Sequence, residues 1–304
     1  MVFSRCIPIY LKLYKFTIWL DSSIGSLDTQ EVQITAMFKV ISLDIDGTLK
    51  GANGEPSPHT KEVLNQCVDS GAIICIATGR SLKSAKIFTD NLEMISYIIS
   101  FQGALITGTG SDVPMWQQNL SSHEVDSVLN YFDHKEFQIL VYVGDEIYVE
   151  NLTPWVQSYG QRNEVVIKVV DDLRLIEEPA YRILAVGEDD EISCLELDMR
   201  SEFNGQLYIT RSLPHFCEVL SSSSGKDKAL SWICSQNGYT RKDVIAFGNG
   251  YNDVEMLKWA GRGVALKGSE GLAISVADDV AGFVDQEGVA IYLKSLLDLG
   301  HVGG

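Results

Sequence analysis

Two aspartates, Asp44 and Asp46, end an apolar run in the segment "KVISLDIDGTL", Lys39 to Leu49. Carboxylates this close repel one another, so one of them should hold its proton unless a cation lies between them. Mg²⁺ suits that position, because it prefers oxygen ligands and the sequence has no cluster of His or Cys. A metal-bound carboxylate can attack phosphorus and form an aspartyl-phosphate that water then cleaves. The second acid can protonate the leaving group and later activate the water.

Two further polar segments are candidates for the same site. Thr78, Gly79 and Arg80 follow the apolar run "AIICIA", and "GNGYND", residues 248–253, follows "DVIAF". Ligands of open parallel sheets bind at the carboxyl ends of the strands, so we expect these segments to converge on the two aspartates. The Thr78 hydroxyl would then bind a phosphoryl oxygen, and a lysine would be needed to neutralise the transferring group.

The elements that position these residues follow a regular pattern. Continuous apolar strands that alternate with helices predict a parallel sheet covered on both faces. The first helix should begin with Ser57 as N-cap and Pro58 in the first position. The expected strands are residues 38–44, 72–79, 97–103, 243–250 and 263–266, and the expected helices are residues 57–71, 81–92, 225–238 and 288–299.

The middle of the chain has a different pattern. "FQILVYVGDEIYVE" predicts a hairpin that turns at Gly144 and Asp145, and segments 121–134 and 190–203 are helix-like. We therefore expect an α+β module inserted into an α/β core. The expected domains are an N-terminal extension at 1–37, a core at 38–106 and 213–304, and an insert at 107–212. Trp116, Tyr142 and Tyr148 of the insert could line a pocket, although packing explains them as well.

Composition narrows the functional class. The 304 residues carry a formal net charge of −17, which disfavours binding to nucleic acid or stable association with anionic membranes. It still permits a small phosphorylated metabolite, which needs only a local positive pocket.

The first 20 residues have three basic side chains and no acidic one. That segment is too interrupted for a membrane span, so the chain is expected in the cytoplasm, or in a plastid or mitochondrion if residues 1–36 are a targeting segment. The six cysteines form no CxxC pair, which favours free thiols in a reducing compartment.

Four motifs in order resemble those of the haloacid dehalogenase (HAD) superfamily, in its Cof-type branch, subfamily IIB. They are "DIDGTL", "ATGR", "CEVLSSSSGKDKAL" and "GNGYNDVEML", and the likeness extends from about residue 38 to the C-terminus. The resemblance implies a Rossmann-like parallel-sheet core with an inserted C2-type cap. It also implies a Mg²⁺-dependent phosphatase that hydrolyses a sugar phosphate or a phosphorylated cofactor precursor.

The resemblance also implies roles for individual residues. Asp44 would be the nucleophile, and Asp46 would be the general acid and base. The implied catalytic residues are Asp44, Asp46, Thr78 and Lys226; the implied substrate-binding residues are Thr78, Gly79, Arg80, Lys226 and Asn252; and the implied metal ligands are Asp44, Asp46, Asn249 and Asp253. Some of these residues also have ordinary structural readings: Arg80 as a fold support, Asn249 as a turn cap and Asn252 as a helix N-cap.

The chain departs from the family pattern at three positions. Asn249 stands where the family has an aspartate that binds Mg²⁺ directly, so we expect weaker metal binding. Gln102 takes the place of an asparagine, and Asp227 takes that of a glycine. These changes keep two alternatives open: a protein that binds a phosphorylated ligand with weakened catalysis, and a phosphosugar mutase. The sequence leaves the oligomeric state open.

Overall fold

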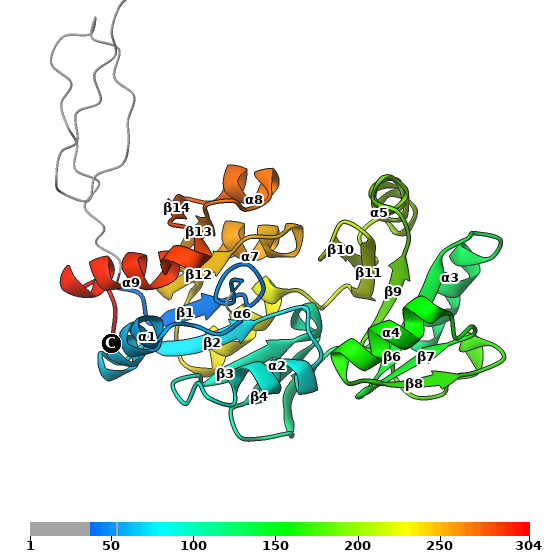
Figure 1. The fold of residues 1–304 in the computed structure, drawn as a ribbon, viewed down its shortest axis with the longest axis horizontal. Coiled ribbons are helices and arrows are strands. Elements are labelled where there is room, and N and C mark those ends of the chain that lie inside the picture. Colours follow the sequence, from blue (N-terminus) through cyan, green and yellow to red (C-terminus); the bar gives the residue numbers. More distant parts are fainter. Residues whose placement is uncertain (1–36, 53) are drawn as a thin grey trace, which may run out of the picture. The chain divides into compact units, whose positions relative to one another are not determined.

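The computed structural model describes residues 37–52 and 54–304 (Figure 1). The predicted N-terminal extension therefore lies, apart from Met37, outside the described residues. None of the described helices is both long and apolar enough to cross a lipid bilayer.

The core is built on a parallel sheet, as the alternating pattern predicts (Figure 1). The strand order is β14-β13-β12-β1-β2-β3-β4-β5, with β4 and β5 antiparallel to their neighbours. All four residues of β1 are buried, which explains the continuous apolar run. The strands are β1 Val40–Leu43, β2 Ile73–Ala77, β3 Tyr97–Ser100, β4 Leu105–Gly108, β5 Pro114–Gln117, β12 Val244–Gly248, β13 Arg262–Leu266 and β14 Asp279–Ala281.

The order of these strands creates a binding edge. From β1 the chain continues to β2 and β3 on one side, whereas β12, β13 and β14 extend the sheet on the other side. The point between β1 and β12 is thus a topological switch point, where ligands of open α/β sheets bind. Asp44 is the first residue after β1 and lies at that point.

The core helices begin where the sequence indicates. The Ser57 side chain accepts a hydrogen bond from the N–H of Thr60 at 3.0 Å, and Ser81 caps the next helix in the same way. Leu230 of α6 and Met256 of α7 belong to one apolar cluster with β1, β2 and β12. The core helices are α1 Pro58–Asp69, α2 Leu82–Thr89, α6 Lys226–Gln236, α7 Val254–Trp259, α8 Gly271–Val276 and α9 Gly288–Asp298.

The cap is a second, mostly antiparallel sheet with the order β10-β11-β9-β6-β7-β8. Its predicted hairpin is present, because β6 pairs with β7 across Gly144. Alternate residues of β6 face opposite sides: Leu140 packs with Val156 of α4, and Val141 packs with Val128 of α3. The elements are α3 Ser122–Phe132, β6 Gln138–Val143, β7 Glu146–Val149, α4 Pro154–Asn163, β8 Val166–Val169, β9 Arg182–Val186, α5 Asp189–Phe203, β10 Leu207–Arg211 and β11 Phe216–Ser221.

The strand pairing shifts the expected borders of the cap. We expected residues 107–212, but β4 and β5 belong to the core sheet, and β11 pairs with β10 and β9 in the cap sheet. The cap thus lies between Leu120 and Ser221. The physical reason is that a short apolar strand carries no signal for the sheet that it joins, since pairing depends on distant neighbours.

The described cysteines carry free thiols, as expected. Burial raises the pKa of the Cys67 thiol to about 12, which keeps it unreactive. The free thiols are Cys67, Cys75, Cys194, Cys217 and Cys234, and Cys6 lies outside the described residues.

Candidate active site

The loop after β1 places Asp44 against the end of β12. The Asp44 N–H donates to the carbonyl of Phe247 at 3.1 Å. The chain then turns at Gly47, which has a φ of +83°. A Cβ on Gly47 would come within 2.3 Å of Asn249 Nδ2, so both the backbone conformation and the lack of space require glycine. The glycine of the first motif therefore allows the fourth motif to approach Asp44.

Lys226 places a buried cation beside Asp44. It is the first residue of α6, and its side chain is 1% exposed. Its Nζ donates to Asp44 Oδ1 at 2.7 Å and to Asp253 Oδ1 at 2.7 Å. Lys228, the other lysine at this helix start, instead donates to the carbonyls of Ser222 and Ser224. The structure therefore brings Lys226, and not Lys228, to the predicted site.

Burial and charge set the protonation of this cluster. Burial raises the pKa of Asp44 to about 7, against the lowering effect of the Lys226 charge; Asp253 and Asp46 raise it further. Burial also lowers the pKa of Lys226, but the charges and hydrogen bonds of Asp253 and Asp44 more than offset this effect and raise it above its usual value. Lys226 thus remains a cation, and Asp44 is protonated more easily than an aspartate in water.

Asp253 lies beside Lys226 and against the start of the loop from residue 249. It is fully buried, and its Oδ2 accepts hydrogen bonds from the N–H groups of Asn249 and Gly250, each at 2.9 Å. Its Oδ1 is bonded to Lys226. Both oxygens are therefore already bonded within the protein, so this arrangement does not favour direct contact of Asp253 with a metal. Asp253 instead fixes Lys226 and the loop that carries Asn249.

Arg80 is held by Asp46. Its Nε and Nη2 donate to the two carboxylate oxygens of Asp46 at 2.7 and 2.6 Å. The Asp46 side chain is 58% exposed, so solvent screens this pair. The Arg80 N–H also donates to Thr78 Oγ1 at 3.2 Å. The pair with Arg80 occupies both carboxylate oxygens of Asp46.

The predicted site residues line one cleft of about 740 Å³. Its core side includes Asp44, Asp46, Thr78, Gly79, Arg80, Asn249 and Asn252, and its cap side includes Tyr142, Trp155, Tyr159, Arg162, Arg182 and His215. Lys226 and Asp253 lie buried behind Asp44. The structure thus brings together all the predicted residues, which come from loops that are up to about two hundred positions apart in the chain.

Comparisons with known proteins identify the family. The sequence profile described as haloacid dehalogenase-like hydrolase matches residues 41–293. The chain belongs to the haloacid dehalogenase-like hydrolase family.

Relatives and solved structures agree with this assignment. A Bacillus subtilis protein named 5-amino-6-(5-phospho-D-ribitylamino)uracil phosphatase is 26% identical over 86% of this chain and 98% of its own length. An HAD-like hydrolase from Bacteroides thetaiotaomicron is 31% identical, with a TM-score of 0.71 over 85% of this chain and 99% of its own. A subclass IIB sugar phosphatase shares the fold, with 22% identity and a TM-score of 0.74 over 87% of this chain and 100% of its own. The expected family, and the expected class of enzyme, an HAD-like phosphatase, are confirmed.

The side chains near Asp44 in this HAD-like hydrolase offer oxygen atoms, which are the type of ligand that Mg²⁺ prefers. Their total negative charge is small. Asp44 offers a carboxylate, and Asn249 offers an amide oxygen that already accepts a hydrogen bond from Thr48 Oγ1 at 3.0 Å. Hard oxygen ligands are those that Mg²⁺ prefers. Within residues 37–52 and 54–304, no three His, Cys, Asp or Glu side chains gather in a way that could hold a metal. An oxygen site at Asp44 is therefore chemically suitable but relies on amide and main-chain oxygens.

The cap residues of the cleft were mostly missed from the sequence. Of the three suggested aromatics, Tyr142 lines the cleft, whereas Trp116 and Tyr148 pack into apolar clusters. Trp155 and Tyr159 are stacked, with ring centroids 5.0 Å apart. They lie four positions apart, on one face of α4. This shared face becomes visible only when the helix and its orientation toward the cleft are known. Arg182 could have been noticed in the sequence, because a charged residue in the apolar strand "YRILAV" is expected to be buried and therefore to have a partner of opposite charge.

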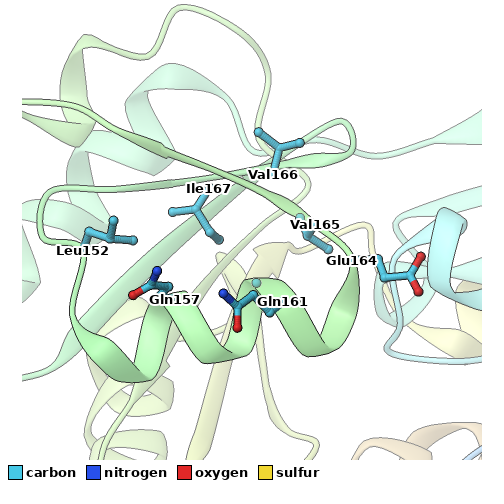
Figure 2. A pocket seen from close by; sticks show the side chains of 8 residues that line it. Leu152, Gln157, Gln161, Glu164, Val165, Val166 and Ile167 are labelled. Carbon is cyan, nitrogen blue, oxygen red and sulfur yellow. The ribbon is translucent and has the colours of Figure 1, made fainter.

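A second hollow of the hydrolase, of about 420 Å³, lies in the cap between α4 and β8 (Figure 2). Figure 2 shows Gln157 and Gln161 on the helix, with Leu152 and Ile167 nearby. Glu164 is the one ionisable side chain among its lining residues. This hollow therefore lacks the cations and paired acids that phosphoryl chemistry requires.

Proposed function

We propose that this hydrolase is a Mg²⁺-dependent phosphatase that cleaves a small phosphomonoester through an aspartyl-phosphate on Asp44. The contact of Lys226 with both Asp44 and Asp253 carries this proposal, because it places a buried cation beside a free carboxylate oxygen at the floor of the cleft. The named activities of its relatives support a sugar phosphate or a phosphorylated cofactor precursor as substrate. The cleft volume fits a molecule of that size.

The reaction begins with attack by Asp44. Its Oδ1 is bonded to Lys226, so Oδ2 attacks phosphorus. The bond between phosphorus and the ester oxygen breaks, and the Asp46 carboxyl gives its proton to the leaving oxygen. A water molecule then attacks the aspartyl-phosphate and gives a proton to the Asp46 carboxylate. Phosphate leaves, and the Asp44 carboxylate is restored.

Separate groups of the cleft would hold the phosphoryl oxygens and the metal. Lys226 Nζ and Thr78 Oγ1 bind phosphoryl oxygens as charge develops in the transition state. The Asp44 carboxylate, the Asp46 main-chain carbonyl and the Asn249 amide oxygen would hold Mg²⁺. The ion, when bound, neutralises charge on the carboxylate and the phosphoryl group.

Replacement of Asp46 tests its role in proton transfer, independently of the attack by Asp44 on phosphorus. Asp46→Asn cannot protonate a leaving oxygen, so we expect its kcat to fall by about 10²–10⁴ for an alkyl phosphate. The loss should be much smaller for p-nitrophenyl phosphate in the first step, because nitrophenolate leaves without a proton. Single-turnover release of nitrophenolate and of phosphate measures the steps separately. If the rate of the first step fell equally for the alkyl and the nitrophenyl phosphate, Asp46 would not be the general acid.

Replacement of Asn249 tests whether the asparagine weakens Mg²⁺ binding and catalysis. Asn249→Asp adds a negative charge to the oxygen donors, so we expect half-maximal activity at about tenfold lower Mg²⁺. The kcat at saturating Mg²⁺ should stay within about threefold of wild type, since Asn249 does not touch the leaving group. An increase in kcat of about a hundredfold or more would instead favour a binding protein with degraded catalysis.

Phosphate release from p-nitrophenyl phosphate, with and without Mg²⁺, tests the proposed function. We expect release that requires Mg²⁺ and that stops when the ion is chelated. A subsequent panel of sugar and cofactor phosphates would rank the two substrate classes. Absence of release at several millimolar Mg²⁺ would contradict the proposed function and favour the binding protein.

A further inference from the structure

Gln102 occupies an unusual place between the core and the cap. It lies in the 3₁₀ turn Phe101–Gly103 after β3, it is fully buried, and its φ of 54° is in the left-handed region. That conformation is uncommon for glutamine, and it persists only where surrounding contacts stabilise it. Its N–H donates to the carbonyl of Thr78 at 3.1 Å. The backbone of Gln102 is thus attached to the loop that is proposed to bind the phosphoryl group.

The side-chain amide of Gln102 joins two distant segments. Its Nε2 donates to Glu218 Oε1 of cap strand β11 at 2.9 Å. Its Oε1 accepts a hydrogen bond from Asn252 Nδ2 at 3.0 Å. Glu218 and Asn252 are both buried, so these bonds are shielded from water. One amide therefore connects a cap strand to the loop that carries Asn249.

Glu218 continues the connection into the cap. Its Oε2 accepts a hydrogen bond from Arg182 Nη1 at 2.5 Å, and the same Nη1 donates to the carbonyl of Gly79 at 2.8 Å. The Arg182 guanidinium lies over the Tyr142 ring, 4.0 Å from its centroid. A Cβ on Gly79 would come within 2.3 Å of Gln102 Nε2, so glycine permits this close approach. The bonds form a closed ring between two cap strands and the Thr78 loop.

We propose that Gln102 is a positioning residue that couples the cap to the phosphoryl site. Any displacement of β9 or β11 would separate Glu218 and Arg182 from their core partners and leave buried polar groups unpaired. Such groups are costly, so the cap and the two loops hold one another in a single arrangement. Gln102 touches none of the reacting atoms and acts through Asn252 and Thr78. This inference rests on the proposed function, and it adds a residue to which the family motifs assign no role.

A charge-swapped pair tests the coupling. In Gln102→Glu/Glu218→Gln, the new amide at position 218 would donate to the new carboxylate at position 102, and its carbonyl would accept from Arg182. Asn252 would still donate to the carboxylate at position 102. The double variant thus keeps every hydrogen bond and the net charge. Each single variant leaves a mismatch that the double variant relieves. Gln102→Glu sets two carboxylates against each other, whereas Glu218→Gln, with its carbonyl facing Arg182, sets its amide N–H donors against those of Gln102.

The quantities to measure for each variant are kcat and KM for p-nitrophenyl phosphate, the inhibition constant of inorganic phosphate, and the melting temperature. Each single variant should lower kcat/KM by about 10- to 100-fold and weaken inhibition by phosphate, as expected for unpaired buried groups. The double variant should recover to within about fivefold of wild type, since the lost interactions are mutual. A double variant no better than the worse single would overturn the proposal. So would single variants that melt earlier but keep the wild-type kcat, KM and inhibition constant.

A third variant covers the case in which neither single variant folds. Gln102→Asn keeps the amide and suits the left-handed backbone better, but its shorter side chain cannot reach both Glu218 and Asn252. We expect a folded protein with kcat/KM lowered by about tenfold. Wild-type kcat/KM in this variant would overturn the coupling role. A wild-type protein without turnover would reject the proposed function and this inference with it. Variants that keep the wild-type kcat/KM, in a wild-type protein that turns over, would reject only the inference.

Discussion

Asp44→Asn should lower the kcat for p-nitrophenyl phosphate by about 10³-fold or more. The amide is a far weaker nucleophile than the carboxylate, and loss of a nucleophile removes the covalent route entirely. The substitution preserves shape, and Lys226 keeps its second partner, Asp253, so we expect the fold to remain. Phosphate release at saturating Mg²⁺ measures the effect.

Asp69→Asn is a matched control for this substitution. Asp69 is the last residue of α1, is exposed to solvent and lies on a different element from the cleft. The control should keep the wild-type kcat and KM. Asp44→Asn with turnover close to that of the control would show that another group attacks phosphorus.

Lys226→Met should damage both stability and catalysis. It leaves Asp44 and Asp253 buried and facing each other without their shared cation, and removal of one partner of a buried ion pair costs about 3–5 kcal/mol. The transferring phosphoryl group also loses a positive charge, which should lower kcat/KM by about 10²–10³. Denaturant unfolding and steady-state kinetics measure the two effects.

Two companion variants separate these effects. Lys228→Met removes a lysine that donates to two carbonyls near the same helix start and lies 5.7 Å from the centroid of the Tyr208 ring. It contacts neither Asp44 nor Asp253, so stability and kcat/KM should change little. Lys226→Met/Asp253→Asn removes one of the two unpaired charges, so stability should partly return while kcat/KM stays low. Recovery of activity in this double variant would show that Lys226 serves the fold alone.

The sequence was sufficient to predict the core and the residues that meet at its edge. Continuous apolar strands predicted the parallel sheet, and each polar segment followed a strand end, so convergence at the switch point could be expected. The choice of Lys226 over Lys228 came from the motif. The cap borders were misplaced, because the pattern of β4 and β11 does not reveal which sheet each strand joins.

The contacts that orient the site were beyond sequence reasoning. The pairing of Arg80 with Asp46 and the bonds of Gln102 with Glu218 and Asn252 join residues between 34 and 150 positions apart. Local pattern carries no information on such pairs. Asp253 is an example: its motif suggested a place near the metal and the lysine, and its hydrogen bonds show in addition that it holds the backbone of Asn249 and Gly250.

Trapping of the phosphoryl group tests the central claim most directly. The wild-type protein is mixed with p-nitrophenyl phosphate and Mg²⁺, quenched within milliseconds and reduced with borohydride, which converts an acyl phosphate into an alcohol. Mass spectrometry of the peptides then locates the modified residue. We expect reduction at Asp44 alone, and none without substrate or in Asp44→Asn. Turnover with an unmodified Asp44, or with the label on another residue, would contradict the aspartyl-phosphate mechanism.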